Sequence, residues 1–288
     1  MKLTDIQVIR GLQKKYGFRT KKKFGQNFLL DTGVIEDILE ASMITPEDVV
    51  VEIGPGIGTL TQALCERGCR VLAVEIDEKL SMLLQESVPY DNLQVLFRDV
   101  LKTDLDKEVR LRYQVDRYKV VANLPYYITS PIIMKLLQSH QNIQSITVMT
   151  QKEVAERMQA SPGGKEYGSL SVAVQYYAHV ELVRTVPPES FSPAPQVDSA
   201  VIHLEVLEEP FVLVQEEELF FALVKGAFQQ RRKTLLNTLS HNITWLSKEQ
   251  WKKLFLSIDM DGQRRGETLS LQEFATISNA LSREKSLR

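Results

Sequence analysis

The segment KVVANLPYYITSP, residues 119–131, places an amide, a proline and an aromatic ring directly after an apolar run. The side-chain oxygen of Asn123 and the carbonyl oxygen of Leu124 can each accept one N–H of an exocyclic amine, which would orient the nitrogen lone pair for attack on a methyl group. Pro125 makes the turn rigid, and Tyr126 offers a flat face on which an unstacked base can rest. Taken alone, the same residues also describe a rigid turn that ends a strand.

A glycine-rich segment, EIGPGIGTLT at residues 52–61, follows the first strand-like run and opens the first helical pattern. Gly54, Gly56 and Gly58 permit positive φ angles and let the backbone approach a ligand closely. Their spacing is G-x-G-x-G, whereas the dinucleotide fingerprint would need glycine at position 59, where this chain has Thr. A tight strand-to-helix turn without a ligand is the alternative interpretation of such a cluster.

Carboxylates at the ends of the next two apolar runs favour a nucleoside-binding site. Glu75 stands 21 residues after Gly54, where a carboxylate can accept from both hydroxyls of a ribose. Asp77 competes for that role, but it precedes EKLSMLL and is expected to cap that helix. Asp99 could accept from an adenine amine while the amide of Val100 meets a ring nitrogen, although an isolated Asp at a strand end is more often a solvated turn residue. A nucleoside site with no need for a pyrophosphate favours S-adenosylmethionine over NAD.

Apolar runs rich in Val and Ile alternate with helix-period segments from residue 48 onward, which indicates buried parallel strands joined by helices. Thr59 and Gln62 are expected to form a capping box, and Gly68 to end that helix. We predict an α/β fold with a Rossmann-like methyltransferase sheet and a small α-helical C-terminal domain. The expected strands are residues 48–53, 70–76, 93–97, 118–122, 144–149, 180–186 and 199–207.

A change to acidic and helical patterns near residue 208 marks the expected domain boundary. Residues 1–207 should form the catalytic domain with a basic N-terminal arm, and residues 208–288 a small helical domain, to which the family resemblance given below assigns RNA binding. Residues 1–23 hold eight Lys or Arg and one Asp, although the net charge of the whole chain is −2. Such an arm can attract a polyanion, but a solvated terminus explains the same charges.

Taken together, these motifs show that the chain resembles the rRNA adenine N6-dimethyltransferase family, and most closely its small-subunit (16S) branch. The glycine loop is generic to methyltransferases, the NLPY motif narrows the choice to amino methyltransferases, and GQNFL with F-x-P-x-P-x-V-D-S is highly specific. The matching segments are KKKFGQNFLLD (21–31), VVEIGPGIGTLT (50–61), VLAVEID (71–77), RDVL (98–101), NLPYYITSP (123–131), EYGSLSV (166–172), FSPAPQVDSAV (191–201) and FQQRRKTLLNTL (228–239).

The resemblance implies transfer of methyl groups from S-adenosylmethionine to N6 of two adjacent adenosines in 16S rRNA during assembly of the small subunit. It places Phe191 opposite Tyr126, so that the two rings would enclose the target base. The alternative for Phe191 is an aromatic residue that fills the core between prolines. The implied catalytic residues are Asn123, Leu124, Pro125, Tyr126 and Phe191, and the implied cofactor-binding residues are Asn27, Leu29, Gly54, Gly56, Glu75, Ile76, Asp99, Val100 and Asn123.

One position departs from the family pattern, because Tyr127 stands where many relatives carry Asn after NLPY. Its role is left unassigned. The basic clusters at 21–23, 231–233 and 264–265 are candidate phosphate contacts, and a solvated face is an equally good explanation of each. No His, Cys or acidic grouping predicts a metal site, and no apolar run is long enough to predict a membrane span. A monomer in the cytoplasm is expected.

Three other functions compete with this interpretation. A large-subunit rRNA methyltransferase of the resistance type would share the glycine loop but lack the FSPAPQVDS and QRRKTLLN context. A non-catalytic RNA-binding assembly or transcription factor would not need Glu75, Asn123, Pro125 and Tyr126 together. An NAD-dependent oxidoreductase is disfavoured by the glycine spacing.

Overall fold

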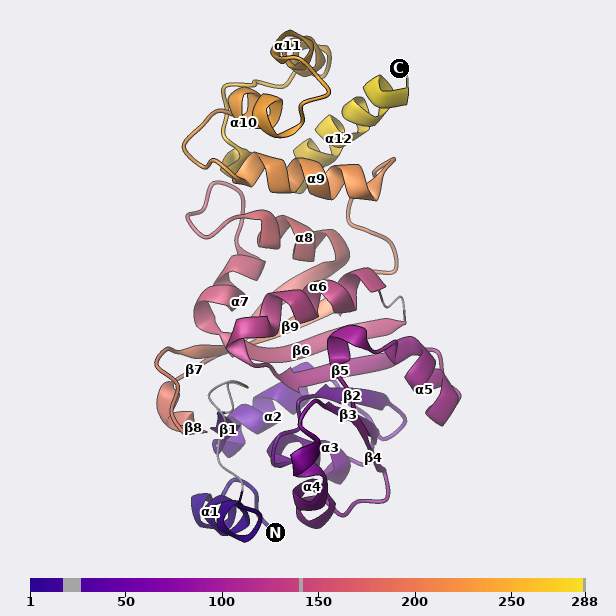
Figure 1. Cartoon of the computed structure of the whole chain (residues 1–288), viewed down its shortest axis with the longest axis vertical. Coiled ribbons are helices and arrows are strands. Elements are labelled where there is room, and N and C mark those ends of the chain that lie inside the picture. The colour runs from indigo at the N-terminus through magenta and orange to yellow at the C-terminus, as the bar shows by residue number, and fades with distance from the viewer. Residues whose placement is uncertain (18–26, 140–141, 287–288) are drawn as a thin grey trace. The chain divides into compact units, whose positions relative to one another are not determined.

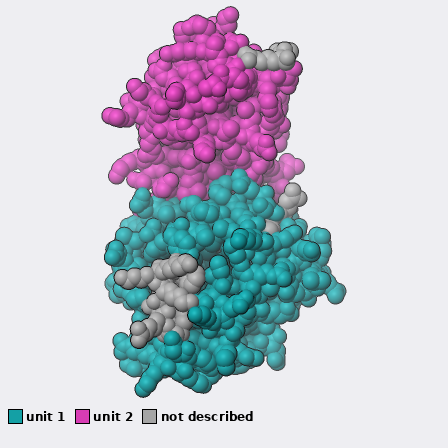
Figure 2. All heavy atoms as spheres, viewed as in Figure 1, with its two compact units in different colours: residues 1–155, 179–206 teal, residues 156–178, 207–288 magenta. Residues whose placement is uncertain are grey.

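The computed structural model describes residues 1–17, 27–139 and 142–286, which form two compact units (Figure 2). Unit 1 comprises residues 1–155 and 179–206, and unit 2 comprises residues 156–178 and 207–288. The expected division at residues 207 and 208 differs from this one mainly in the segment 156–178, which packs with the C-terminal helices. Its sequence carries no composition change that would have assigned it there.

Unit 1 is built on a seven-stranded sheet with the order β4-β3-β2-β5-β6-β9-β7 (Figure 1). The pairs β2–β3, β2–β5, β3–β4 and β5–β6 are parallel, whereas β9 runs antiparallel to β6. This arrangement confirms the predicted α/β class. The strands are β2 (Val49–Ile53), β3 (Arg70–Glu75), β4 (Leu93–Phe97), β5 (Tyr118–Asn123), β6 (Ile143–Gln151), β7 (Ala178–Val186) and β9 (Ser199–Val206).

The central strands form because runs such as VVVEI are apolar on both faces and can be buried from both sides. One face is covered by α2 and α3, whose apolar residues pack in a single core cluster with strand residues such as Val50, Val71 and Val121. Burying these side chains supplies most of the driving force for folding of this unit. The helices of unit 1 are α1 (Ile6–Lys15), α2 (Thr32–Ala41), α3 (Thr59–Glu66), α4 (Ser81–Ser87), α5 (Leu105–Tyr113) and α6 (Thr129–Ser139), and α7 (Lys152–Gln159) continues into unit 2.

The predicted capping box at the start of α3 is wrong. Gly58 is the N-cap residue and makes no side-chain hydrogen bond, while the Gln62 side chain contacts the backbone of Met1 and Leu3. The helix α3 therefore begins without a side-chain cap, at a glycine in the left-handed conformation. Two other predictions are confirmed: Asp77 caps the short helix that precedes α4, and Gly68 follows the end of α3 with a φ of 84°.

A second, two-stranded sheet joins the N-terminal segment to the loop between β7 and β9. Strand β1 (Phe28–Leu29) pairs antiparallel with β8 (Phe191–Ser192), and the amide of Leu30 donates to the carbonyl of Ser190. The Ser190 hydroxyl donates to the carboxylate of Asp31, which also caps α2. Residues near 28 and residues near 191, far apart in sequence, are therefore bound to each other.

Unit 2 is helical and has a core of its own. It contains α8 (Ser169–Tyr177), α9 (Glu217–Phe228), α10 (Leu235–Asn242), α11 (Lys248–Ser257) and α12 (Leu271–Ser286). Its largest buried side chains include Phe220, Trp251 and Phe274. Among the helices of the described residues, none combines the length and apolar character that a membrane crossing requires.

Gly58 gives a stability prediction, because its φ is 95° and a Cβ there would lie 2.8 Å from Cγ1 of Val88. We expect Gly58→Ala to destabilise the protein by about 1–3 kcal/mol from the backbone conformation alone, with an added contribution from the clash. Gly54→Ala is the matched control, since Gly54 also has a positive φ of 72° but no heavy atom within 4 Å of its Cβ position. Denaturant unfolding should show a larger loss for Gly58→Ala, and equal losses would contradict the packing argument.

Candidate active site

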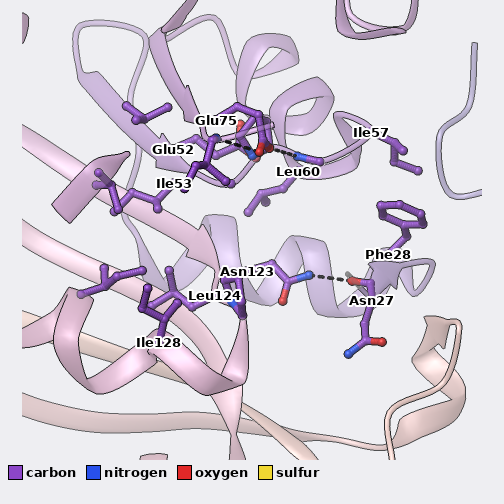
Figure 3. A pocket seen from close by; sticks show the side chains of 18 of the residues that line it. Asn27, Phe28, Glu52, Ile53, Ile57, Leu60, Glu75, Asn123, Leu124 and Ile128 are labelled. Atoms are coloured by element: carbon purple, nitrogen blue, oxygen red, sulfur yellow. Dashed lines mark hydrogen bonds between the residues drawn. The ribbon is translucent and has the colours of Figure 1, made fainter. Parts of the chain in front are cut away.

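A cavity opens at the carboxyl ends of the parallel strands β2, β3 and β5 (Figure 3). This is the edge at which open α/β sheets bind ligands. Every predicted site residue except Phe191 lines it, and they are Asn27, Leu29, Gly54, Gly56, Glu75, Ile76, Asp99, Val100, Asn123, Leu124, Pro125 and Tyr126. The fold therefore brings together residues from β1, the glycine loop and the ends of β3, β4 and β5.

The amide of Asn123 is oriented by one hydrogen bond. Its Nδ2 donates to the backbone carbonyl oxygen of Asn27 at 3.1 Å, as Figure 3 shows. The side-chain oxygen has no hydrogen-bond partner within the described part of the chain. Asn123 therefore presents its side-chain oxygen as an acceptor for a further contact, while Nδ2 keeps one more N–H.

The turn after Asn123 is also held in place. The amide of Leu124 donates to the carbonyl of Met149 on β6 at 3.0 Å, and the amide of Ile128 donates to the carbonyl of Pro125 at 3.2 Å. Tyr126 is half-buried and lines the cavity, and Tyr127 lines it with 62% of its surface exposed. No contact of Tyr127 with another described residue gives it a role, so its role stays unassigned.

Glu75 is buried and its carboxylate is held by three backbone amides. Oε1 accepts from Ile76 and Asp77 at 2.8 Å each, and Oε2 accepts from Gly56 at 3.2 Å. Burial raises the pKa of this carboxyl, and the three amides oppose that rise because they favour the charged form. The bond to Gly56 joins the end of β3 to the glycine loop, so the two cofactor elements are tied together before any ligand binds.

Sequence reasoning missed Glu52, which also lines the cavity and is only 1% exposed. Its Oε2 has no hydrogen-bond partner among the residues that the structure describes. Burial raises the pKa of Glu52 to about 8, and the negative charge of Glu75 acts in the same direction. The signal was present in the sequence, because an acid interrupts the otherwise apolar run VVVEI two positions before Gly54.

These features fit an S-adenosylmethionine-sized ligand with a cationic end. A Cβ on Gly54 would meet no heavy atom within 4 Å, so the backbone at that point borders open space in the cavity. The unpartnered oxygen of Glu52 suits a positively charged group, since a buried carboxylate needs a cationic or hydrogen-bonding partner. Within the described ranges, no three His, Cys, Asp or Glu side chains come together in a way that could hold a metal ion.

Asp99 lines the cavity two residues after the end of β4. Oδ1 of Asp99 accepts from the amide of Leu101 at 3.0 Å and so caps the short helix that begins at Val100. The other oxygen, Oδ2, lies 3.9 Å from Nζ of the exposed Lys102. Ile76 lies beside this position and is 54% exposed, which provides an apolar surface at the cavity wall.

Phe191 does not line the cavity, in contrast to the placement that the resemblance implied. It is 4% exposed and packs in the core cluster that contains Leu29, Val186 and Val201. The pairing of β8 with β1 turns this side chain inward, because Leu29 and Phe191 are register partners. Phe191 is thus buried in this structure, and its place opposite the target base stays a prediction.

Two of the three basic clusters contain residues with structural partners. Arg231 donates to the carbonyls of Lys165 and Tyr167, and Arg264 is paired with Glu273. Arg232 and Lys233 are exposed. The cluster at 21–23 lies outside the described residues.

The chain matches the family described as ribosomal RNA adenine dimethylase over residues 17–282. It is 46% identical over 282 residues to a ribosomal RNA small subunit methyltransferase A from Alkaliphilus metalliredigens, with 98% of each chain covered. A protein of the same description from Bacillus pumilus is 49% identical over 276 residues, with 94% of each chain covered.

Solved structures show the same similarity. A dimethyladenosine transferase from Plasmodium falciparum has a TM-score of 0.75 and 27% identity, covering 90% of this chain and 98% of that one. The 23S rRNA methyltransferase ErmE has a TM-score of 0.67 and 25% identity, covering 89% of this chain and 100% of that one. The sequence similarity is thus much greater to the small-subunit enzymes than to this large-subunit enzyme.

The buried carboxyl of Glu52 predicts an unusual pH dependence of stability without ligand. Between its ordinary pKa near 4.5 and its folded pKa of about 8, the folded protein holds a proton that the unfolded chain releases. Stability contributed by this group therefore falls as the pH rises through that window. We expect Glu52→Gln to match the wild type near pH 5 and to unfold at a higher temperature by pH 8, with a gain of at least about 1 kcal/mol.

Glu40→Gln is the matched control, because Glu40 is an exposed carboxylate on α2. Thermal unfolding from pH 5 to 8.5 would compare both variants with the wild type. A difference between Glu52→Gln and the wild type that does not change with pH would contradict a protonated Glu52.

Proposed function

The chain belongs to the ribosomal RNA adenine dimethylase family, and we propose that it methylates N6 of two adjacent adenosines in the 16S rRNA of the immature small subunit. It is an rRNA adenine dimethyltransferase that depends on S-adenosylmethionine. The observation that supports the chemistry most directly is the orientation of Asn123, whose Nδ2 donates to the carbonyl of Asn27 and whose side chain lines the cavity. A monomer in the cytoplasm is part of the same proposal.

In this proposal the catalytic turn holds the target amine by its two N–H groups. The side-chain oxygen of Asn123 accepts one and the carbonyl oxygen of Leu124 accepts the other, which leaves the nitrogen lone pair free to attack. S-adenosylmethionine supplies an electrophilic methyl group when bound. Neither Asn123 nor Leu124 is a base, so the proton that the methylated nitrogen loses passes to water, and the rate gain comes from proximity and alignment. Tyr126 provides the face on which the extruded base rests.

The cofactor would be held along the opposite wall of the cavity. Gly54 and Gly56 let the backbone approach it closely, and Glu75 offers the remaining acceptor capacity of its Oε2 to the ribose. Asp99, Val100 and Ile76 are assigned to the adenine end. Asn27 and Leu29 complete the site from β1, and Glu52 is added as the partner of the cationic amino acid end.

RNA affinity is proposed to come from phosphates, with the arm at residues 21–23 as the first candidate. In unit 2 we assign the role to Arg232 and Lys233, because they are exposed while Arg231 is engaged by backbone carbonyls. Arg264 is removed from the set of phosphate contacts, because its guanidinium pairs with Glu273. Arg265 is exposed and lies no closer than 3.9 Å to Glu267, so it remains a candidate.

The substrate is tested by incubating the protein with methyl-labelled S-adenosylmethionine and each purified ribosomal subunit. We expect label in the small subunit, and mass mapping of its rRNA should show dimethyladenosine at two adjacent positions. Label confined to the large subunit would refute the proposed substrate. No label in either subunit would refute the proposed activity.

Asn123→Ala tests the catalytic assignment. Removing one acceptor should lower kcat at least about a hundredfold, the scale seen when one hydrogen-bonding group at a reacting centre is lost. Calorimetric titration should show S-adenosylmethionine binding within a few-fold of the wild type, since the glycine loop and Glu75 are untouched.

Asn92→Ala is the control, because its half-buried amide donates to the carbonyls of Cys65 and Cys69 away from the cavity. It should lose stability but keep its turnover number. Unchanged turnover in Asn123→Ala would count decisively against the proposed role.

A further inference from the structure

Three buried hydroxyl side chains surround the turn that follows Asn123. Ser199 and Thr150 are 0% exposed, and Thr129 is 1% exposed. Thr150 and Ser199 lie at one end of the β6–β9 pair, where Thr150 faces Ala200 and Gln151 faces Ser199. Each hydroxyl makes a hydrogen bond that leads to the turn.

The first contact fixes the aromatic ring. The hydroxyls of Tyr126 and Ser199 share a hydrogen bond of 2.5 Å across 73 residues of sequence. Burial raises the pKa of the Tyr126 phenol, so the group remains protonated near neutral pH and can take part as a neutral hydroxyl. The ring is consequently held at its outer end by β9 and at its backbone by the turn.

The second contact fixes the backbone beside the proposed acceptor. Oγ1 of Thr150 donates to Oγ1 of Thr129 at 3.0 Å, and Thr129 donates in turn to the carbonyl oxygen of Pro125 at 3.2 Å. The amide of Leu124 is bound to Met149 on the same strand as Thr150. The carbonyl of Leu124 therefore lies between two anchored points.

We propose that Ser199, Thr129 and Thr150 are positioning residues, a hydroxyl clamp that sets the Leu124 carbonyl and the Tyr126 ring for methyl transfer. The inference rests on the proposed function, since it assigns these hydroxyls to the same reaction. Packing alone does not require them, because replacing both partners of a buried hydrogen bond by apolar groups of the same shape can be nearly neutral. Catalysis does require them, since a misplacement of about 1 Å can cost a hundredfold in rate.

The clamp should matter more for the second methyl than for the first. The unmodified amine offers two N–H groups, one for each acceptor, whereas the monomethylated amine keeps only one. With one hydrogen bond lost, alignment of the nitrogen depends more on the Tyr126 ring and on the exact place of the turn. Loosening the clamp should therefore let monomethyladenosine accumulate.

Thr150→Val is the first test, and Thr147→Val is its matched control. Thr147 is also a fully buried threonine on β6, but its hydroxyl bonds to Nδ1 of His203 at 2.8 Å, away from the turn. Both variants should lose similar stability in thermal unfolding. Thr150→Val should lower kcat roughly 10- to 100-fold with an unchanged KM for S-adenosylmethionine, and Thr147→Val should keep the wild-type kcat.

The ratio of monomethyl to dimethyladenosine, measured by mass spectrometry, should rise in Thr150→Val and stay at the wild-type value in Thr147→Val. Thr150→Ser keeps the hydroxyl and should restore both kcat and the ratio. Equal kcat and equal product ratios for Thr150→Val and Thr147→Val would overturn the clamp. If the wild type transfers no methyl group to adenosine, the proposed function fails before this comparison is reached.

A second test uses the contact between Ser199 and Tyr126. Ser199→Ala and Tyr126→Phe should each lower kcat by a similar factor and raise the monomethyl fraction, because each removes the same hydrogen bond. The double variant should be no slower than Tyr126→Phe alone. A multiplicative loss in the double variant would show that Ser199 does not act through the Tyr126 hydroxyl and would overturn that half of the clamp.

Discussion

The hydrogen bond from Nδ2 of Asn123 to the carbonyl of Asn27 is the contact on which the site depends. An amide can present either end to a substrate, and engaging its nitrogen with a backbone carbonyl leaves its oxygen for the target amine. The bond joins the end of β5 to the start of β1, which is itself paired with β8. The reacting group is therefore oriented by segments that lie 96 residues apart in the chain.

The two buried acids proposed to bind the cofactor, Glu75 and Glu52, have different surroundings. Glu75 accepts from three backbone amides, which supports its charge within a buried site. Glu52 lacks a partner for one oxygen among the described residues, and burial favours its protonated form. A ligand that carries both hydroxyls and a positive charge complements this pair. The unpartnered oxygen of Glu52, which is unfavourable to bury by itself, would then bind the positive charge.

Sequence reasoning succeeded where the chemistry is carried by local motifs. The NLPY turn, the glycine loop and Glu75 lie at the ends of adjacent parallel strands, so the alternation of apolar runs was enough to predict that they meet. Sequence reasoning did not identify the partner of a polar side chain where several partners were available. Gln62 contacts the N-terminal backbone and makes no capping box, and Arg231 binds carbonyls within unit 2.

By itself the sequence determined the α/β class, the family resemblance and many, though not all, of the residues that line the cavity, because strand periodicity and short motifs are local properties. Only the tertiary structure decided that Phe191 faces the core, that segment 156–178 belongs to unit 2, and that Ser199 and Thr150 reach the catalytic turn. Each of these depends on strand register and on contacts between residues distant in the chain. Such long-range pairings leave no periodic signal in the sequence, so they become visible only when the sheet is assembled.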